Sequence, residues 1–161
     1  MDMRTGGCNC AQVRFQVAGE PVRVGLCHCQ VCRKETGSLG NLFAVWRSDD
    51  ASVTGETRSW RLSTDHRHFC PGCGSSVFGI VDGANEIEVR VGALDDAPSG
   101  LAPAYELWVG RRERWLAPIA GSEQHDGNRA SLIRSKSGRW TAGVDPVRTL
   151  PIQPGRGGER Q

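Results

Sequence analysis

Seven cysteines in three tight groups constrain this chain more than any other feature of its sequence. They occur as Cys8/Cys10, as Cys27/Cys29/Cys32 and as Cys70/Cys73. An odd number of thiols cannot pair off completely into disulfides, and cysteines two or three positions apart are typical of metal ligands. We therefore expect the thiols to form metal sites and not a disulfide framework.

The last cysteine pair lies in the segment CPGCG, residues 70–74, where two thiols flank a tight Pro-Gly turn. This is a zinc knuckle, which supplies half of a tetrahedral site, so another pair must come from elsewhere in the chain. Cys8 and Cys10 are two positions apart, and the flexible glycines before them allow both side chains to face one ion. The spacing predicts a closed structural site formed by Cys8, Cys10, Cys70 and Cys73.

The remaining cysteines, Cys27, Cys29 and Cys32, lie close enough in sequence to reach one metal together. Three protein ligands and a vacant position distinguish a reactive zinc centre from a structural one. The sequence therefore predicts two Zn²⁺ ions per chain, one in a closed site of four thiolates and one in an open site of three.

A histidine could instead complete the second site as a closed Cys3His centre, with His28, His66 and His68 as the candidates. His28 lies between two cysteines on an alternating backbone, so we expect its side chain to point away from the metal that they share. For His66 and His68 we favour an ordinary place on a strand.

The periodicity of the chain predicts a mainly β fold of antiparallel sheets with short helical turns. Apolar and polar residues alternate in residues 13–17 and 86–91, as in half-buried strands. Runs rich in β-branched and aromatic residues predict further strands within residues 21–26, 41–46, 57–62, 75–81 and 104–109. Residues 30–37 are expected to form a helical turn that Gly37 ends, and residues 82–85 a hairpin connection.

Composition changes near residue 126. We expect a zinc domain over residues 1–125 and a basic, partly disordered C-terminal tail rich in Gly and Pro over residues 126–161. Acidic residues slightly outnumber basic ones before this point, which disfavours a nucleic-acid partner. The chain shows no signal peptide and no apolar stretch that could span a bilayer, so we expect a cytoplasmic protein with no membrane contact; the oligomeric state stays open.

Four segments together resemble one known family: GGCNC, CHCQVCRKETGS, RHFCPGCGSSVF and VGALDD. The chain is similar to the glutathione-dependent formaldehyde-activating enzymes, a family that includes centromere protein V. The resemblance implies a zinc-bearing β-tent fold, a structural zinc on the first and last cysteine pairs and a catalytic zinc on Cys27, Cys29 and Cys32. It also implies a carbon–sulfur lyase that acts on S-hydroxymethylglutathione. This chain has Ala11 where the family often has Gly.

Three thiolates around Zn²⁺ form an anionic centre that favours a soft sulfur ligand over water activation. Nearby cations should offset this charge, and Arg33 and Lys34 directly follow Cys32. We expect Arg33 to act with the three cysteines in catalysis, and Arg111, Arg112 and Arg114 form a second candidate cluster. The expected partner is a small thiol adduct derived from glutathione.

Two other functions remain open at this point. The chain can be a non-enzymatic zinc module that binds a protein or a nucleic acid, which the basic tail would favour. It can also be a scavenger of aldehydes or a redox sensor, in which the open site loses its metal and oxidises.

Overall fold

The computed structural model describes residues 2–62, 64–129, 131–134 and 140–143. The chain divides into two compact units, Met1–Arg129 and Ala130–Gln161. In the second unit β12 (Ser131–Arg134) pairs antiparallel with β13 (Trp140–Gly143). Most of the predicted tail beyond residue 134 lies outside the described residues, so its partial disorder, like the boundary at residue 126, stays a prediction. No helix in the described part of the chain has both the length and the apolar composition for a membrane span.

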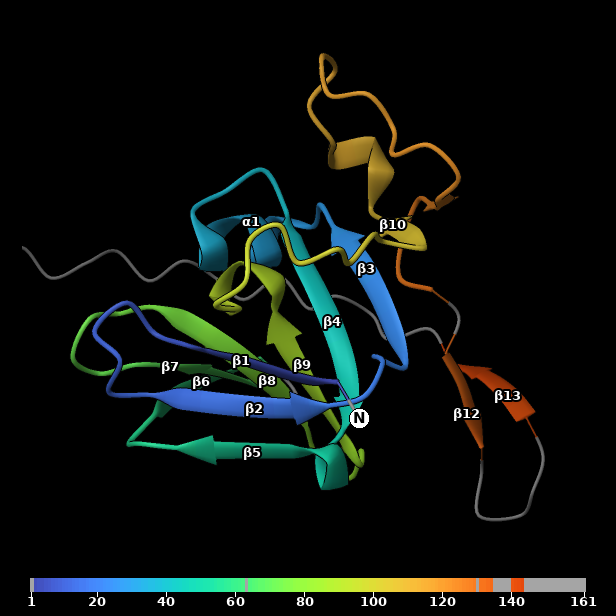
Figure 1. Ribbon diagram of the computed structural model, residues 1–161. Coiled ribbons are helices and arrows are strands. Elements are labelled where there is room, and N and C mark those ends of the chain that lie inside the picture. The colour runs from blue at the N-terminus through green and yellow to red at the C-terminus, as the bar shows by residue number, and fades with distance from the viewer. Residues whose placement is uncertain (1, 63, 130, 135–139, 144–161) are drawn as a thin grey trace, which may run out of the picture. The chain divides into compact units, whose positions relative to one another are not determined.

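The first unit is mainly β, which confirms the predicted fold class (Figure 1). A small antiparallel sheet has the order β1-β2-β5, with β1 (Met3–Gly7), β2 (Arg14–Ala18) and β5 (Ala51–Thr54). A larger mixed sheet has the order β11-β10-β3-β4-β9-β8-β7-β6. Its strands are β3 (Arg23–Cys27), β4 (Asn41–Arg47), β6 (Arg58–Leu62), β7 (Asp65–Phe69), β8 (Ser76–Val81), β9 (Glu86–Arg90), β10 (Tyr105–Leu107) and β11 (Glu123–His125). The helices described are α1 (Gln30–Thr36) and the short 3-10 turns η1 (Ser48–Asp50), η2 (Val91–Ala93) and η3 (Val109–Arg111).

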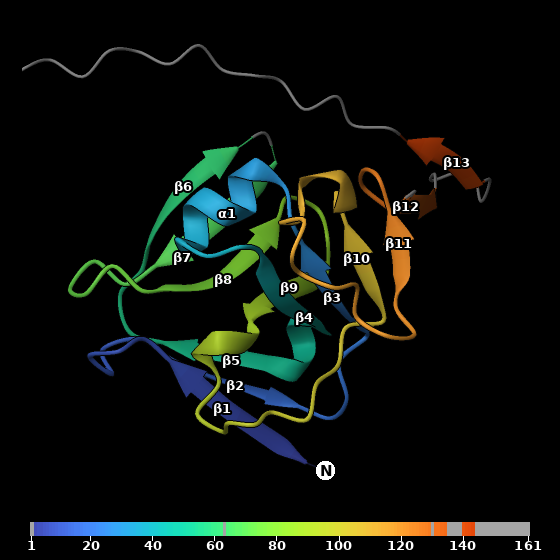
Figure 2. The ribbon, with the colours of Figure 1, turned by 90° about the horizontal axis from the view of Figure 1, so that it is seen from above.

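Strand β4 is buried on both faces and separates two apolar clusters. Successive side chains of a strand point to opposite faces, so Ala44 and Trp46 join a core with residues of the small sheet, such as Phe15. Phe43 and Val45 join a second cluster, which also contains three cysteines and Tyr105 of β10. Helix α1 lies on this second face, away from the small sheet (Figures 1 and 2). The larger sheet therefore places the three-cysteine segment on the face opposite the main core.

Several predicted elements form as expected, and β10 differs. Helix α1 ends at Gly37, which adopts the left-handed conformation at φ 61°, and residues 82–85 connect the antiparallel strands β8 and β9. The strand expected over residues 104–109 stops at Leu107, because Trp108 is also left-handed, with φ 58°. Moreover, β10 runs parallel to both β3 and β11, a pairing between distant segments that strand periodicity does not reveal.

Candidate metal centres

Two loops that are distant in sequence bring the first and last cysteine pairs together. Cys8 and Cys10 lie in the loop after β1, and Cys70 and Cys73 in the loop after β7. Their four Sγ atoms lie within 4.8 Å of one another, with 3.5 Å between Cys8 and Cys10 and 3.6 Å between Cys10 and Cys70. A zinc tetrahedron with Zn–S bonds of about 2.3 Å needs sulfur–sulfur edges of about 3.8 Å. The donor set and its spacing therefore fit a closed zinc site.

Backbone hydrogen bonds shape both loops around the sulfurs. Val13 N donates to Cys8 Sγ at 3.2 Å, and Ala11 N donates to Cys8 O at 3.0 Å. On the other loop Gly74 N donates to Cys70 O at 2.9 Å. Ala11 closes its turn in the left-handed region, with φ 62°, where a side chain is strained. A glycine at this position would avoid that strain.

Ala11→Gly is expected to raise the free energy of unfolding by about 0.5–1 kcal/mol, because glycine enters the left-handed region without the Cβ clash. Urea unfolding measures the change. The reverse control is Gly37→Ala, since Gly37 has φ 61° and open space where a Cβ would lie, so only the backbone strain is added. We expect this control to lose a similar amount. A loss of stability in Ala11→Gly would contradict the strain argument.

The second cluster forms where β3 passes into α1. Cys27 is the last residue of β3, Cys29 is the N-cap of α1, and Cys32 lies in its first turn. The three Sγ atoms lie within 4.8 Å of one another, with Cys27 and Cys32 buried and Cys29 half-buried. Cys32 N donates to Cys29 Sγ at 3.3 Å. Three thiols that converge in this way fit a zinc ion with one further coordination position.

Hydrogen bonds within this cluster favour a single thiolate at Cys29. The thiols of Cys27 and Cys32 donate to Cys29 and lower its pKa to about 2. The same interaction with Cys29 raises the pKa of Cys27 to about 12, and the hydrogen bonds with Cys27 and Cys29 raise the pKa of Cys32. A metal that binds all three sulfurs must therefore displace the protons of Cys27 and Cys32.

None of the three candidate histidines belongs to a metal-ligand cluster in the described residues. His28 is fully buried, and its Nε2 lies 2.8 Å from Glu106 Oε2. His66 Nε2 lies 3.0 Å from Asp82 Oδ1, while His68 contacts the Thr57 hydroxyl. The geometry thus gives each imidazole a partner other than the cysteines.

The predicted cations beside Cys32 have different environments. The Arg33 guanidinium donates to Arg111 O at 2.8 Å and to the Glu113 carboxylate, whereas Lys34 is exposed. Arg33 thereby fastens α1 to the loop that contains η3. In the second cluster, Arg111 lies over the Trp108 ring at 4.7 Å. Arg112 donates to Glu106, and Arg114 is exposed.

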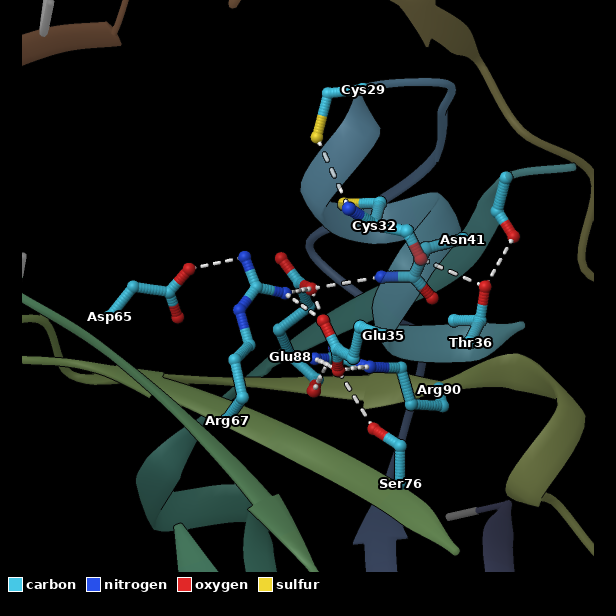
Figure 3. Close-up of polar contacts among 11 residues, drawn as sticks. Cys29, Cys32, Glu35, Thr36, Asn41, Asp65, Arg67, Ser76, Glu88 and Arg90 are labelled. Atoms are coloured by element: carbon cyan, nitrogen blue, oxygen red, sulfur yellow. Dashed lines mark hydrogen bonds and ion pairs between the residues drawn. The ribbon is translucent and has the colours of Figure 1, made fainter. Parts of the chain in front are cut away.

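The sequence did not reveal a buried network of charged residues beneath α1, which Figure 3 shows together with Cys29 and Cys32. Glu35, only 2% exposed, accepts hydrogen bonds at Oε1 from Arg90 Nε at 3.0 Å and from Ser76 Oγ at 2.7 Å. Arg90 also donates to Glu88 Oε1 at 2.7 Å. Because Glu35 follows Cys32 by three positions on the helix, the network fixes the face of α1 that carries this cysteine.

Arg67 of β7 extends this network toward the three cysteines. It donates to Glu88 Oε1 at 3.0 Å and pairs with Asp65 (Figure 3). Burial alone would lower the pKa of Arg67, but the charges of Glu88, Asp65 and Glu35 raise it, and Cys32 adds to this effect. Arg67 is thus a buried cation that three carboxylates of the network surround. No local sequence signal connects it with the three-cysteine centre, because it lies 35 positions after Cys32.

A cavity of about 530 Å³ lies beside α1. Glu35 and Thr36 of the helix line one part of it, and Asn41, Ser76 and Arg90 line other parts. Helix α1 therefore contributes Cys32 to the metal centre and Glu35 to a polar cavity.

The chain is similar to known proteins both in sequence and in structure. The sequence model of the family described as glutathione-dependent formaldehyde-activating enzyme matches residues 3–111, a range that contains all seven cysteines. The crystal structure of a Rhodobacter sphaeroides protein is similar at 23% sequence identity, over 62% of this chain and 97% of that chain, with a TM-score of 0.49. Since the family match spans well over half of the sequence, this chain belongs to the glutathione-dependent formaldehyde-activating enzyme family.

Proposed function

We propose that this protein is a zinc-dependent, carbon–sulfur lyase-like enzyme that acts on a thiol adduct of an aldehyde, of the S-hydroxymethylglutathione type. The observation that carries the proposal is the convergence of Cys27, Cys29 and Cys32, with no fourth protein ligand among the described residues. The family's name mentions glutathione and formaldehyde, and we propose their adduct as the substrate.

In this proposal the two clusters have different tasks. Cys8, Cys10, Cys70 and Cys73 would hold a structural zinc, and Cys27, Cys29 and Cys32 a catalytic one. When bound, a zinc ion held by three thiolates supplies a coordination position suited to soft sulfur or to an aldehyde oxygen. The reaction joins the thiol sulfur to the aldehyde carbon and moves the thiol proton to the aldehyde oxygen, and the reverse reaction undoes both changes.

The surrounding side chains would position the adduct and limit access of water. Trp108 packs against the cluster that contains the cysteines, and Arg111 lies over its ring. Arg33 keeps its predicted catalytic role in the proposal, as a positive charge near a substrate carboxylate, while it holds the loop of Arg111 to α1.

The partner and the compartment belong to the same proposal. A small glutathione-derived thiol is the expected partner, and we expect neither a nucleic acid nor a membrane. A cytoplasmic location fits best, because free thiols persist in a reducing compartment.

Exchange spectroscopy of formaldehyde with glutathione tests this function. We expect the zinc-loaded chain to accelerate interconversion of free formaldehyde and the adduct, and to accelerate it less with thiols that lack the glutamyl and glycyl parts. The chain treated with a mild chelator serves as the matched control and should return to the uncatalysed rate. An equal rate with and without the zinc-loaded chain would rule out this activity.

A further inference from the structure

Glu106 is a fully buried carboxylate in the middle of β10, where it lies between β3 and β11. Its Oε1 accepts hydrogen bonds from Ile119 N at 2.8 Å, Ser122 Oγ at 3.1 Å and Gln124 Nε2 at 2.8 Å. Its Oε2 contacts His28 Nε2 and accepts from Arg112 at 3.1 Å. A buried charge needs such partners, and here they come from His28 of the cysteine segment and from residues 112–124.

These contacts keep the carboxylate in its charged, accepting form. Burial alone would raise the pKa of Glu106, but the hydrogen bonds from Gln124 and His28 lower it to about 2. An apolar side chain could fill the same space without needing these hydrogen bonds. The burial of a charge at this position thus calls for an explanation beyond packing.

His28 connects this carboxylate to the cysteines. The residue stands between Cys27 and Cys29, and it is held at three points. Its backbone N donates to Leu107 O at 3.0 Å, its Nε2 lies 2.8 Å from Glu106 Oε2, and its Nδ1 lies 3.3 Å from Leu39 O. With the imidazole fixed on one side of the backbone, the two neighbouring thiols are directed to the other side.

We propose that Glu106 is a positioning residue that orients the three-cysteine centre through His28 and couples it to the segment of residues 109–125. The inference rests on the proposed function in one respect, that Cys27, Cys29 and Cys32 bind a metal. Side chains that hydrogen-bond to metal ligands commonly change metal affinity by about 10–100-fold when they are replaced, and Glu106 acts on two ligands through the His28 that stands between them. The segment of residues 109–125, which Glu106 holds through hydrogen bonds, also contains Arg111 and Glu113. Both residues contact Arg33, which directly follows Cys32, so Glu106 is linked to the cysteines by this second route as well.

Glu106→Gln tests the proposal in the zinc-loaded full chain. Either orientation of the new amide turns its NH2 group toward at least one donor, Arg112 on one side or Ile119 N on the other. Zinc release is followed with a colorimetric indicator as the chelator concentration rises. We expect one zinc, from the three-cysteine centre, to leave at chelator concentrations about 10–100-fold lower than in the unchanged chain. The zinc of the four-cysteine centre should leave as before and is an internal reference.

Glu86→Gln is the matched control, because it removes the same charge from a glutamate that pairs with Arg23, at the end of β3 and β4 opposite to Cys27. It should leave both release phases unchanged. If Glu106→Gln does not fold, Ser122→Ala and Gln124→Ala each remove one neutral donor to Oε1 and should shift the same first phase by a smaller factor. No shift in the folded variants, or an equal shift of both phases, would overturn the proposal.

Zinc release is measured without thiol or aldehyde, so it separates this inference from the proposed function. A shifted first phase in a chain that does not accelerate formaldehyde exchange would support the role of Glu106 and reject the lyase. An unchanged chain that releases both zincs in one phase would overturn the division into two centres and the role of Glu106 with it.

Discussion

Replacing Cys70 by serine is expected to leave the chain without a stable fold, even with excess zinc. Cys70 and Cys8 are buried in the main core, and their cluster joins the loop after β1 to the loop after β7. Structural zinc in small sites contributes about 10–16 kcal/mol of binding free energy, while a domain's net stability is only about 5–15 kcal/mol. Loss of a ligand that releases this ion removes an amount comparable to the whole net stability. Circular dichroism and zinc content measure the result.

Cys32→Ser is the matched variant, because Cys32 is also buried, at 4% exposure, but belongs to the three-cysteine centre. We expect this variant to stay folded, to retain one zinc per chain and to lose acceleration of formaldehyde exchange. Its free energy of unfolding should fall only by about 1–3 kcal/mol, the usual range for a buried substitution. If Cys32→Ser unfolds as Cys70→Ser does, the division into a structural and a catalytic centre is wrong.

The sequence predicts the elements whose pattern is local. The alternation of Phe15 and Val17 with polar neighbours indicates β2, and both side chains are buried in the core. Gly37 marks the end of α1, because one glycine in the left-handed conformation is enough to end a helix and is visible in the sequence. Cysteine spacing predicts both clusters, since ligands of one metal lie close in sequence within each pair or triplet.

Features that depend on distant segments were not predictable in this way. Strand β7 reads DHRHF, without an apolar alternation, because it presents charged groups to the network under α1. The parallel pairing of β10 with β3 sets Leu107 opposite Cys27 and brings Glu106 to His28, and no periodicity encodes it. From the sequence alone a charged residue such as Arg90 is expected to be exposed to solvent. Its burial requires partners that only the fold brings together.

The ion pair between Glu35 and Arg90 makes the network beneath α1 sensitive to the loss of either charge. The two side chains are 2% and 5% exposed, and Arg90 NH2 lies 2.5 Å from Glu35 Oε1. Glu35 Oε2 and Arg67 Nε, both buried, have no hydrogen-bond partner among the described residues, although Oε2 lies 3.5 Å from Arg67 NH1. If Glu35 is replaced, Arg90 keeps Glu88 as its one carboxylate partner among the described residues.

Glu35→Ala is expected to lower the free energy of unfolding by about 3–5 kcal/mol, because it leaves Arg90 buried with only part of its counter-charge. Glu86→Ala gives the contrast, since Glu86 belongs to the same strand as Arg90 and pairs with Arg23, but its side chain is 36% exposed. An exposed pair is worth at most about 1 kcal/mol. Urea unfolding of both variants measures the difference. Equal losses of unfolding free energy would contradict the claim that burial makes the Glu35–Arg90 pair more stabilising than an exposed pair. Because Glu35 shares α1 with Cys32, the Glu35 variant should also release the zinc of the three-cysteine centre more readily, which the Glu86 variant should not.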